Sequence, residues 1–147
     1  MRLLFARRVA AVLVVAGAAF VQAAPAEAAE QFPSGDNREF SVKWSGEWES
    51  INRMEDITVQ LCDLDLVDPD MAVARLEVWL QNASGPVTRE LAPVVMRIRQ
   101  DTTPCREWSS MYLGYSEYLR WVRVVYGGSQ SGLTDATKWV KNPHSGF

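Results

Sequence analysis

Residues 76–98 read LEVWLQNASGPVTRELAPVVMRI and carry the clearest β-hairpin signal in the chain. Apolar residues recur at every second position over Leu76–Leu80, which is the period of a strand with one buried face. The stretch 82–86 holds Asn, Ser, Gly and Pro and predicts a turn, after which alternation resumes and continues to Ile98. Pro93 lacks a backbone donor, so we expect it at a strand start, at a bulge or on a sheet edge.

Two strands are predicted before this hairpin. Residues 40–45 alternate apolar and polar side chains, and we expect Gly46 to end that strand. Residues 57–61 alternate in the same way, but the apolar positions change parity beyond them. Because a one-residue shift turns every side chain to the opposite face, we expect a β-bulge or a strand end near Leu61 and Cys62.

After the hairpin, residues 118–126 are β-branched and aromatic enough for a strand buried on much of both faces. A helix over 109–123 is the alternative, and Gly114 in its interior weighs against it. The stretch 127–132 predicts a flexible loop, and 137–140 predicts a short last strand. Short strands separated by turns predict an all-β fold, an antiparallel β-sandwich or a small barrel, after a cleaved N-terminal signal helix.

The beginning of the chain has the pattern of a secretory signal peptide. Three arginines flank the apolar run 9–21, which as a helix is about 20 Å long, well short of a bilayer core of about 30 Å. Small residues allow cleavage after Ala23, Ala26 or Ala28. We therefore expect a secreted, extracellular product with no stable membrane anchor.

These features divide the chain into a signal peptide over 1–23, a flexible lead-in over 24–37 and a single β-domain over 38–147. The formal net charge of −3 becomes −6 without residues 1–23, because that segment holds three arginines and no acidic residue. A net negative domain without a basic cluster in its sequence argues against nucleic acid and anionic lipid as partners. No pattern implies a cofactor, and we expect a monomer.

The two cysteines of the chain, Cys62 and Cys105, both lie in the predicted β-domain. In an oxidising compartment an isolated pair predicts a disulfide, and two buried free thiols are the alternative. The chain-entropy estimate for a loop of this length is about 4 kcal/mol of stabilisation.

Three sets of residues are candidates for catalysis or metal binding, and each has a simpler explanation. The four aspartates within 63–70 could surround a calcium ion, but exposed strand positions followed by an Asp-Pro turn explain them as well. Glu47 and Glu49 flank Trp48 as a glycosidase acid pair can, yet a solvated loop is the simpler interpretation. The single histidine, His144, lies too near the C-terminus for a rigid triad. We therefore predict no catalytic and no metal-binding residue.

The six tryptophans are a heavy aromatic load for a chain of this size. Trp79 shares strand parity with Arg75 and Glu77 rather than with the apolar positions of its strand. An exposed indole on a sheet suits stacking on a sugar or insertion into a partner's pocket. The alternative is that the sheet is covered on both faces and Trp79 belongs to a second layer. Trp79 and Trp48 are therefore speculative ligand-binding residues.

Several segments resemble small, uncharacterised secreted β-domain proteins of high-GC Gram-positive bacteria. The shared features are an Ala-rich leader, the strand Val59-Gln60-Leu61-Cys62, a second cysteine some forty residues on, and the late strand Tyr-Leu-Arg-Trp-Val-Arg at 118–123. The resemblance covers the β-domain without a diagnostic motif and implies no known activity.

Together these patterns predict a secreted, non-enzymatic binding module whose partner is an extracellular protein or a glycan. The alternative function is inhibition of an extracellular hydrolase through a rigid loop near the disulfide, at 101–108. Coplanar exposed aromatics would favour a glycan ligand, whereas a convex, ordered loop would favour inhibition.

Overall fold

A computed structural model describes residues 29–67, 69–98 and 104–146, which form strands and one short 3-10 helix. The strands are β1 (Glu30–Gln31), β2 (Gly35–Asp36), β3 (Phe40–Ser50), β4 (Arg53–Asp63), β5 (Ala72–Gln81), β6 (Val87–Arg97), β7 (Cys105–Gly114), β8 (Tyr118–Gly128), β9 (Gly132–Ala136) and β10 (Val140–Lys141), and the helix is η1 (Pro143–Ser145). The predicted signal peptide and its cleavage sites lie outside the described residues. In the described part of the chain, no helix has the length and hydropathy that crossing a membrane requires.

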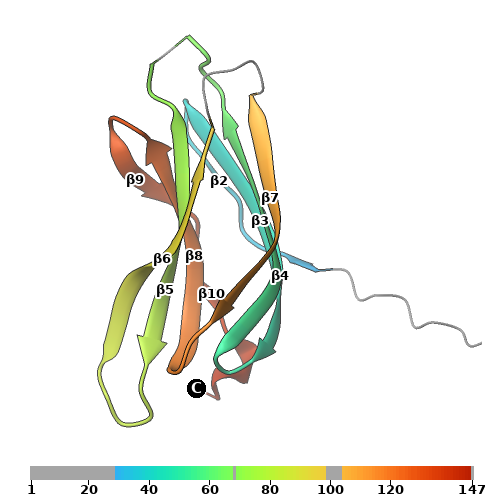
Figure 1. Cartoon of the computed structure of the whole chain (residues 1–147), viewed down its shortest axis with the longest axis vertical. Coiled ribbons are helices and arrows are strands. Elements are labelled where there is room, and N and C mark those ends of the chain that lie inside the picture. Colours follow the sequence, from blue (N-terminus) through green and yellow to red (C-terminus); the bar gives the residue numbers. More distant parts are fainter. Residues whose placement is uncertain (1–28, 68, 99–103, 147) are drawn as a thin grey trace, which may run out of the picture.

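The strands form two antiparallel sheets that pack face to face as a β-sandwich (Figure 1). The first sheet has the order β1-β3-β4-β7, with β2 also paired to β3. The second sheet has the order β10-β8-β5-β6, with β9 also paired to β8. The chain changes sheet after β4, β6 and β7, an interleaved order typical of Greek-key sandwiches. The prediction of an all-β sandwich is confirmed.

The predicted hairpin is β5 and β6, joined by a turn in which Gly85 N donates to Asn82 O over 3.2 Å. β6 is the edge strand of the second sheet. Pro93 lies in β6 where the register shifts, since Arg75 opposes Val95 while Glu77 opposes Leu91. Both an edge and a bulge therefore accommodate the missing donor, as predicted.

The segment 109–123, which had competing helix and strand interpretations, contains no helix and consists of strand on both sides of a short connection at 115–117. β7 and β8 are antiparallel to their neighbours, and β8 lies between β5 and the short strands β9 and β10. Val122 and Val124 are fully buried on the inner face of β8. β-branched residues on a central strand pack between two layers, which explains why the strand prevails over the helix.

The core lies between the sheets and consists of aliphatic side chains with a few aromatic ones. Its largest fully buried members are Trp44, Met54, Ile57, Leu61, Leu76, Met96 and Leu119. Cys62 and Cys105 oppose each other on β4 and β7 and form the predicted disulfide. β4 ends at Asp63, so the expected parity change near Cys62 is a strand end.

Gly46 does not end the first long strand, contrary to the prediction. β3 runs on to Ser50, and its register with β4 shifts between Ser45 and Glu47. Gly46 occupies that β-bulge, where a Cβ atom would lie 2.6 Å from Met54 Cε. The glycine therefore lies in a closely packed bulge inside a strand rather than in a turn, and a larger residue there would displace the Met54 side chain.

The prediction of a flexible lead-in over 24–37 is wrong for its described part, residues 29–37. β1 and β2 both pair with β3, and Phe32 is buried against Trp44 with ring centroids 4.6 Å apart. Phe32 is the single large apolar side chain in this range. That one ring fills a place in the core, and the edge of β3 supplies the backbone partners.

The glycine-rich stretch 127–132 is not a flexible loop, because it contains the end of β8, a tight turn over 129–131 and the start of β9. Asp70 holds this turn by accepting hydrogen bonds from Gln130 N over 2.5 Å and Ser131 N over 3.1 Å. A Cβ atom at Gly128 would lie 1.9 Å from Asp70 Oδ2, so the turn and the carboxylate fit only without a side chain there. The last strands also differ from the prediction of one strand over 137–140, because β9 precedes that range and β10 begins at its end.

Candidate binding site

The described aspartates within 63–70, namely Asp63, Asp65 and Asp70, do not gather around a common point. Asp63 accepts a hydrogen bond from Asp65 N, and Asp70 holds the β8–β9 turn, while Asp68 lies outside the described residues. Asp63 and Asp70 are both buried, which corrects the interpretation of these residues as exposed strand positions. Among the described residues, no group of three or more His, Cys, Asp or Glu side chains could hold a metal ion.

Glu47 and Glu49 belong to the continued strand β3 rather than to a loop. Glu47 opposes Glu55 on β4, and Glu49 forms an ion pair with Arg53 over 2.9 Å. The side chains of that ion pair are each 50% exposed, so the pair is solvated.

His144 lies in η1, where its Nε2 is 3.0 Å from Trp48 O. This contact ties the C-terminal segment to β3. Among the described residues, His144 has no hydrogen bond to a carboxylate or a hydroxyl that could complete a catalytic triad.

Trp48 is not an exposed aromatic. Its indole is half-buried and packs against the core, and its Nε1 is buried without a hydrogen-bond partner among the described residues. Because Trp48 lies on the first sheet and Trp79 on the second, the structure does not bring the two candidate tryptophans together.

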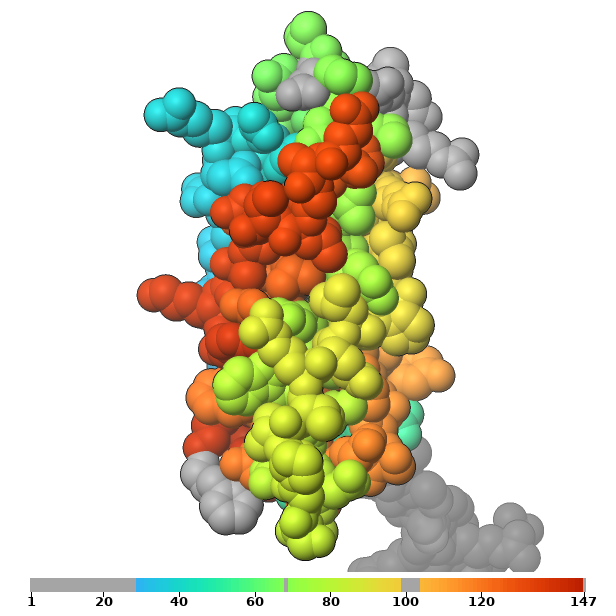
Figure 2. Space-filling view, turned by 90° about the vertical axis from the view of Figure 1, so that its left-hand side faces the viewer, coloured from blue at the N-terminus to red at the C-terminus, as the bar shows by residue number. Residues whose placement is uncertain are grey.

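Trp79 lies on the outer face of the second sheet, as its parity predicted. Trp79 opposes Arg89 on β6 and Trp121 on β8, so these three side chains form a row across the sheet. Glu77 forms the next row between Leu91 and Arg123. Figure 2 looks onto this side of the molecule, with β6 in yellow and β9 in orange-red.

We call this surface the arginine–tryptophan face. It comprises the outward residues of β5 (Val73, Arg75, Glu77, Trp79, Gln81), β6 (Val87, Arg89, Leu91, Val95, Arg97) and β8 (Trp121, Arg123, Val125), together with Trp139.

Glu77 is the centre of an ion-pair network on this face. Its side chain is 8% exposed; one carboxylate oxygen accepts from Arg123 Nε over 2.6 Å, and the other accepts from Arg89 Nε. The Arg123 guanidinium lies 4.3 Å from the ring centroid of Trp139, and the Arg89 guanidinium lies 5.9 Å from it. Two cations share one buried carboxylate, so the network keeps a net positive charge and places it on an aromatic ring.

Trp139 packs against Trp79, with ring centroids 5.3 Å apart and ring planes inclined by 56°. Trp79 is half-buried, and its Nε1 is buried without a partner among the described residues. Trp79 therefore belongs to a second aromatic layer outside the sheet, which was the alternative interpretation, rather than forming a flat, open platform.

Exposed aliphatic side chains gather on the β6 side of the arginine–tryptophan face. The exposed fractions of Val87, Leu91 and Val95 are 47%, 39% and 40%. Across the seam between the sheets, Val94 on β6 and Tyr112 on β7 are 42% and 70% exposed. β6 and β7 are the terminal strands of their sheets, so apolar side chains and sheet edges occur together here.

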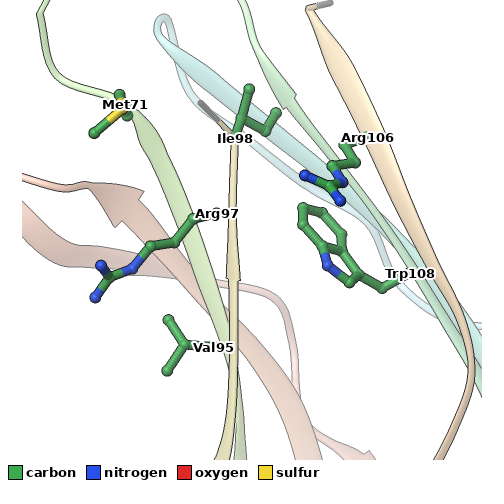
Figure 3. Close-up of a pocket in the computed structure, with 6 residues that line it drawn as sticks. All are labelled: Met71, Val95, Arg97, Ile98, Arg106 and Trp108. Carbon is green, nitrogen blue, oxygen red and sulfur yellow. The ribbon is translucent and has the colours of Figure 1, made fainter. Parts of the chain in front are cut away.

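Two pockets adjoin β6, and Val95 and Arg97 line both of them. One, of about 350 Å³, opens at the seam, where Arg106 and Trp108 of β7 point toward β6 (Figure 3). The other, of about 280 Å³, lies on the arginine–tryptophan face beside the β8–β9 turn, and its lining includes Arg75 and Arg97. Figure 3 shows the Arg97 side chain on the side of β6 that faces away from Trp108.

The loop proposed for hydrolase inhibition is described only in part. Residues 101–103 lie outside the described residues. Cys105 already begins β7, and Arg106 stacks on Trp108 with its guanidinium 5.3 Å from the ring centroid. The described part of this segment is thus a strand rather than a projecting loop.

Comparison of the chain with protein-family models, with curated proteins and with solved structures finds no match. The candidate site therefore rests on geometry, and the resemblance to secreted bacterial β-domains stays a prediction.

Sequence reasoning found Trp79 but missed the side chains around it. Trp121 and Arg123 flank the inward residue Val122, so their shared parity was readable once that segment was taken as a strand. Their position beside Trp79 depends on the pairing of β5 with β8, which joins residues more than forty positions apart. No pattern in the sequence around Trp139 indicates its contact with this face.

Proposed function

We propose that this chain is an exported, non-enzymatic binding module that recognises a protein partner through its arginine–tryptophan face. The single observation that carries the proposal is the gathering of three tryptophans, four arginines and exposed aliphatic residues on one outer face. Trp and Arg are the residues most enriched at the centres of protein interfaces, where large side chains exclude water around charge-assisted contacts.

The charge of the face supports an acidic partner. The whole chain has a formal net charge of −3, yet the arginine–tryptophan face carries four arginines against the one carboxylate of Glu77. Folding thus produces a basic surface on an acidic protein. A negatively charged surface on the partner complements it and increases the association rate.

A protein partner is favoured over a glycan by the state of the indoles. Stacking on a sugar ring requires an accessible, flat aromatic face. Trp139 covers part of Trp79, and Trp48 packs against the core. Exposed valine and leucine side chains beside the arginines suit an apolar protein surface better than a polar sugar.

Export is part of the proposal and rests on the signal-peptide pattern of residues 1–23. The disulfide between Cys62 and Cys105 supports it, because such bonds persist in oxidising compartments. Mass spectrometry of culture fluid and cells tests it. We expect an oxidised chain that begins after Ala23, Ala26 or Ala28 outside the cell, whereas only full-length reduced chain inside the cell contradicts it.

Affinity capture tests the binding face. The oxidised chain, with and without residues 1–23, is immobilised and exposed to extracellular proteins and polysaccharides. We expect a retained acidic protein that Leu91→Asp and Arg89→Glu lose, because both exposed residues lie on the arginine–tryptophan face.

The matched control is Lys43→Glu, a charge reversal on the outer face of the first sheet. We expect this variant to retain the partner as the unchanged chain does. Capture that all three variants keep, or that all three lose equally, rules out the arginine–tryptophan face as the contact surface.

A further inference from the structure

The pocket beside the β8–β9 turn combines positive charge with an apolar floor. It has a volume of about 280 Å³. Val73, Val95 and Leu133 supply apolar surface, while Arg75 and Arg97 bring two guanidinium groups to the same opening. Val73 opposes Arg97, and Arg75 opposes Val95, so the two arginines stand diagonally on neighbouring strands.

Arg97 is the cation available to a ligand. Its side chain is exposed, and it has no hydrogen bond or ion pair with any other described residue. Figure 3 shows its guanidinium extending from β6 on the same side as Val95 and Met71. A guanidinium in this state can form two parallel hydrogen bonds to a carboxylate.

Arg75 is held in place but keeps its charge. Its Nε and Nη2 donate to the backbone oxygen of Ala92 over 3.3 and 2.6 Å. A carbonyl oxygen is neutral, so this contact orients the guanidinium without compensating it. Nη1 of Arg75 has no hydrogen-bond partner in the described part of the chain and stays available to a ligand.

Glu77 and Asp70, two described carboxylates near the pocket, already have ion-pair or hydrogen-bond partners. Glu77 is shared between Arg89 and Arg123. Asp70 accepts hydrogen bonds from Gln130 N and from Ser131, and these bonds lower the pKa of Asp70. Neither carboxylate forms an ion pair with Arg97.

We propose that this pocket binds a carboxylate that carries a small apolar group, with Arg97 as the main contact, Arg75 as the second cation and the valine floor against the apolar part. On a protein partner this chemistry occurs at the C-terminus of a chain and on acidic side chains. The inference rests on the proposed function, since the pocket is the upper part of the arginine–tryptophan face.

Two probes that differ only in charge test the proposal. The oxidised chain is titrated with N-acetyl-leucine, which carries a carboxylate, and with N-acetyl-leucinamide, which does not, and backbone and arginine Nε–H signals are followed by NMR. We expect the acid to shift the signals of Val95, Arg97 and the β8–β9 turn, with a dissociation constant of about 1 mM for a ligand of this size. The amide is expected to leave them unchanged. N-acetyl-aspartic acid α-amide, whose only carboxylate is on the side chain, distinguishes an acidic side chain from a chain terminus.

Variants locate the site. Arg97→Gln is expected to weaken binding of the acid about tenfold, as the loss of one charge-assisted contact does. Lys43→Gln removes a positive charge on the outer face of the first sheet, away from the pocket, and is expected to change nothing. Circular dichroism and a free-thiol assay verify that both variants keep the fold and the disulfide.

Equal binding of acid and amide, no binding of the acid, or equal weakening by both variants overturns the carboxylate pocket. If the probe fails while Leu91→Asp still abolishes partner capture, the binding face stands without this pocket. If the probe binds and no variant affects capture, the pocket exists and the proposed function fails.

Discussion

The two outer faces of the sandwich differ in chemistry although both are built on antiparallel strands. On the first sheet, Lys43, Gln60 and Glu107 oppose one another across β3, β4 and β7. The equivalent row on the second sheet is Arg89, Trp79 and Trp121. The first row is polar and balanced in charge, as expected of a solvated sheet.

The second row explains why β5 and β8 are buried on both faces. Glu77 and Val125 point outward yet are only 6% and 7% exposed, and the guanidinium groups of Arg89 and Arg123 contact the Glu77 carboxylate. This difference supports the proposed binding role of the second sheet.

The largest effect is expected from the disulfide, which lies on the first sheet. Replacing both Cys62 and Cys105 by alanine should lower the free energy of unfolding by about 4 kcal/mol. Urea unfolding of the variant, and of the reduced unchanged chain, measures it. A loss below about 1 kcal/mol would show that the first sheet does not depend on its covalent link.

The next largest effect is expected from the ion-pair network on the second sheet. Glu77→Gln removes the charge shared by Arg89 and Arg123 and should cost about 2 kcal/mol, because it leaves two close guanidinium groups uncompensated. Arg89 exposes 55% of its side chain, which keeps the value below that of a fully buried pair. Urea unfolding at pH 7 measures the loss, and high salt should reduce it.

A pH-dependent effect is expected at the β8–β9 turn. The pKa of Asp70 is lowered, chiefly by the hydrogen bond from Gln130 N, so its contribution to stability is present above the unfolded pKa of about 3.9. This contribution is lost as the pH falls through the lower folded pKa. Thermal unfolding between pH 6 and pH 2 should therefore show a flatter pH dependence for Asp70→Asn than for the unchanged chain. Parallel curves for the two proteins would contradict this assignment.

The smallest effect is expected from Glu55→Gln, which is the control for Glu77→Gln. Glu55→Gln breaks an ion pair with Arg53 on the first sheet, where the two side chains are 36% and 50% exposed. We expect a change of about 0.5 kcal/mol or less in the free energy of unfolding, since solvated pairs contribute little. A loss equal to that of Glu77→Gln would remove the energetic contrast between the faces.

Local patterns were sufficient for the β5–β6 hairpin, for parts of β3, β4 and β8, and for the disulfide. Alternation around Leu76–Leu80 and the turn at 82–86 are readable because side-chain direction in a strand depends only on the parity of the residue. The cysteine pair was readable because the chain has no other cysteine with which either could pair. Gly46 and Phe32 were misjudged because their roles depend on Met54 and Trp44, which their own neighbourhoods do not reveal.

The composition of the candidate face was decided by tertiary structure. Parity placed Trp79 outside its strand, but only the pairing of β5 with β6 and β8 put Arg89, Trp121 and Arg123 beside it. The sequence has no basic cluster, and yet the folded chain has a basic face. The physical reason is that strand pairing joins residues distant in the chain, so a surface assembled across strands leaves no contiguous trace in the order of residues.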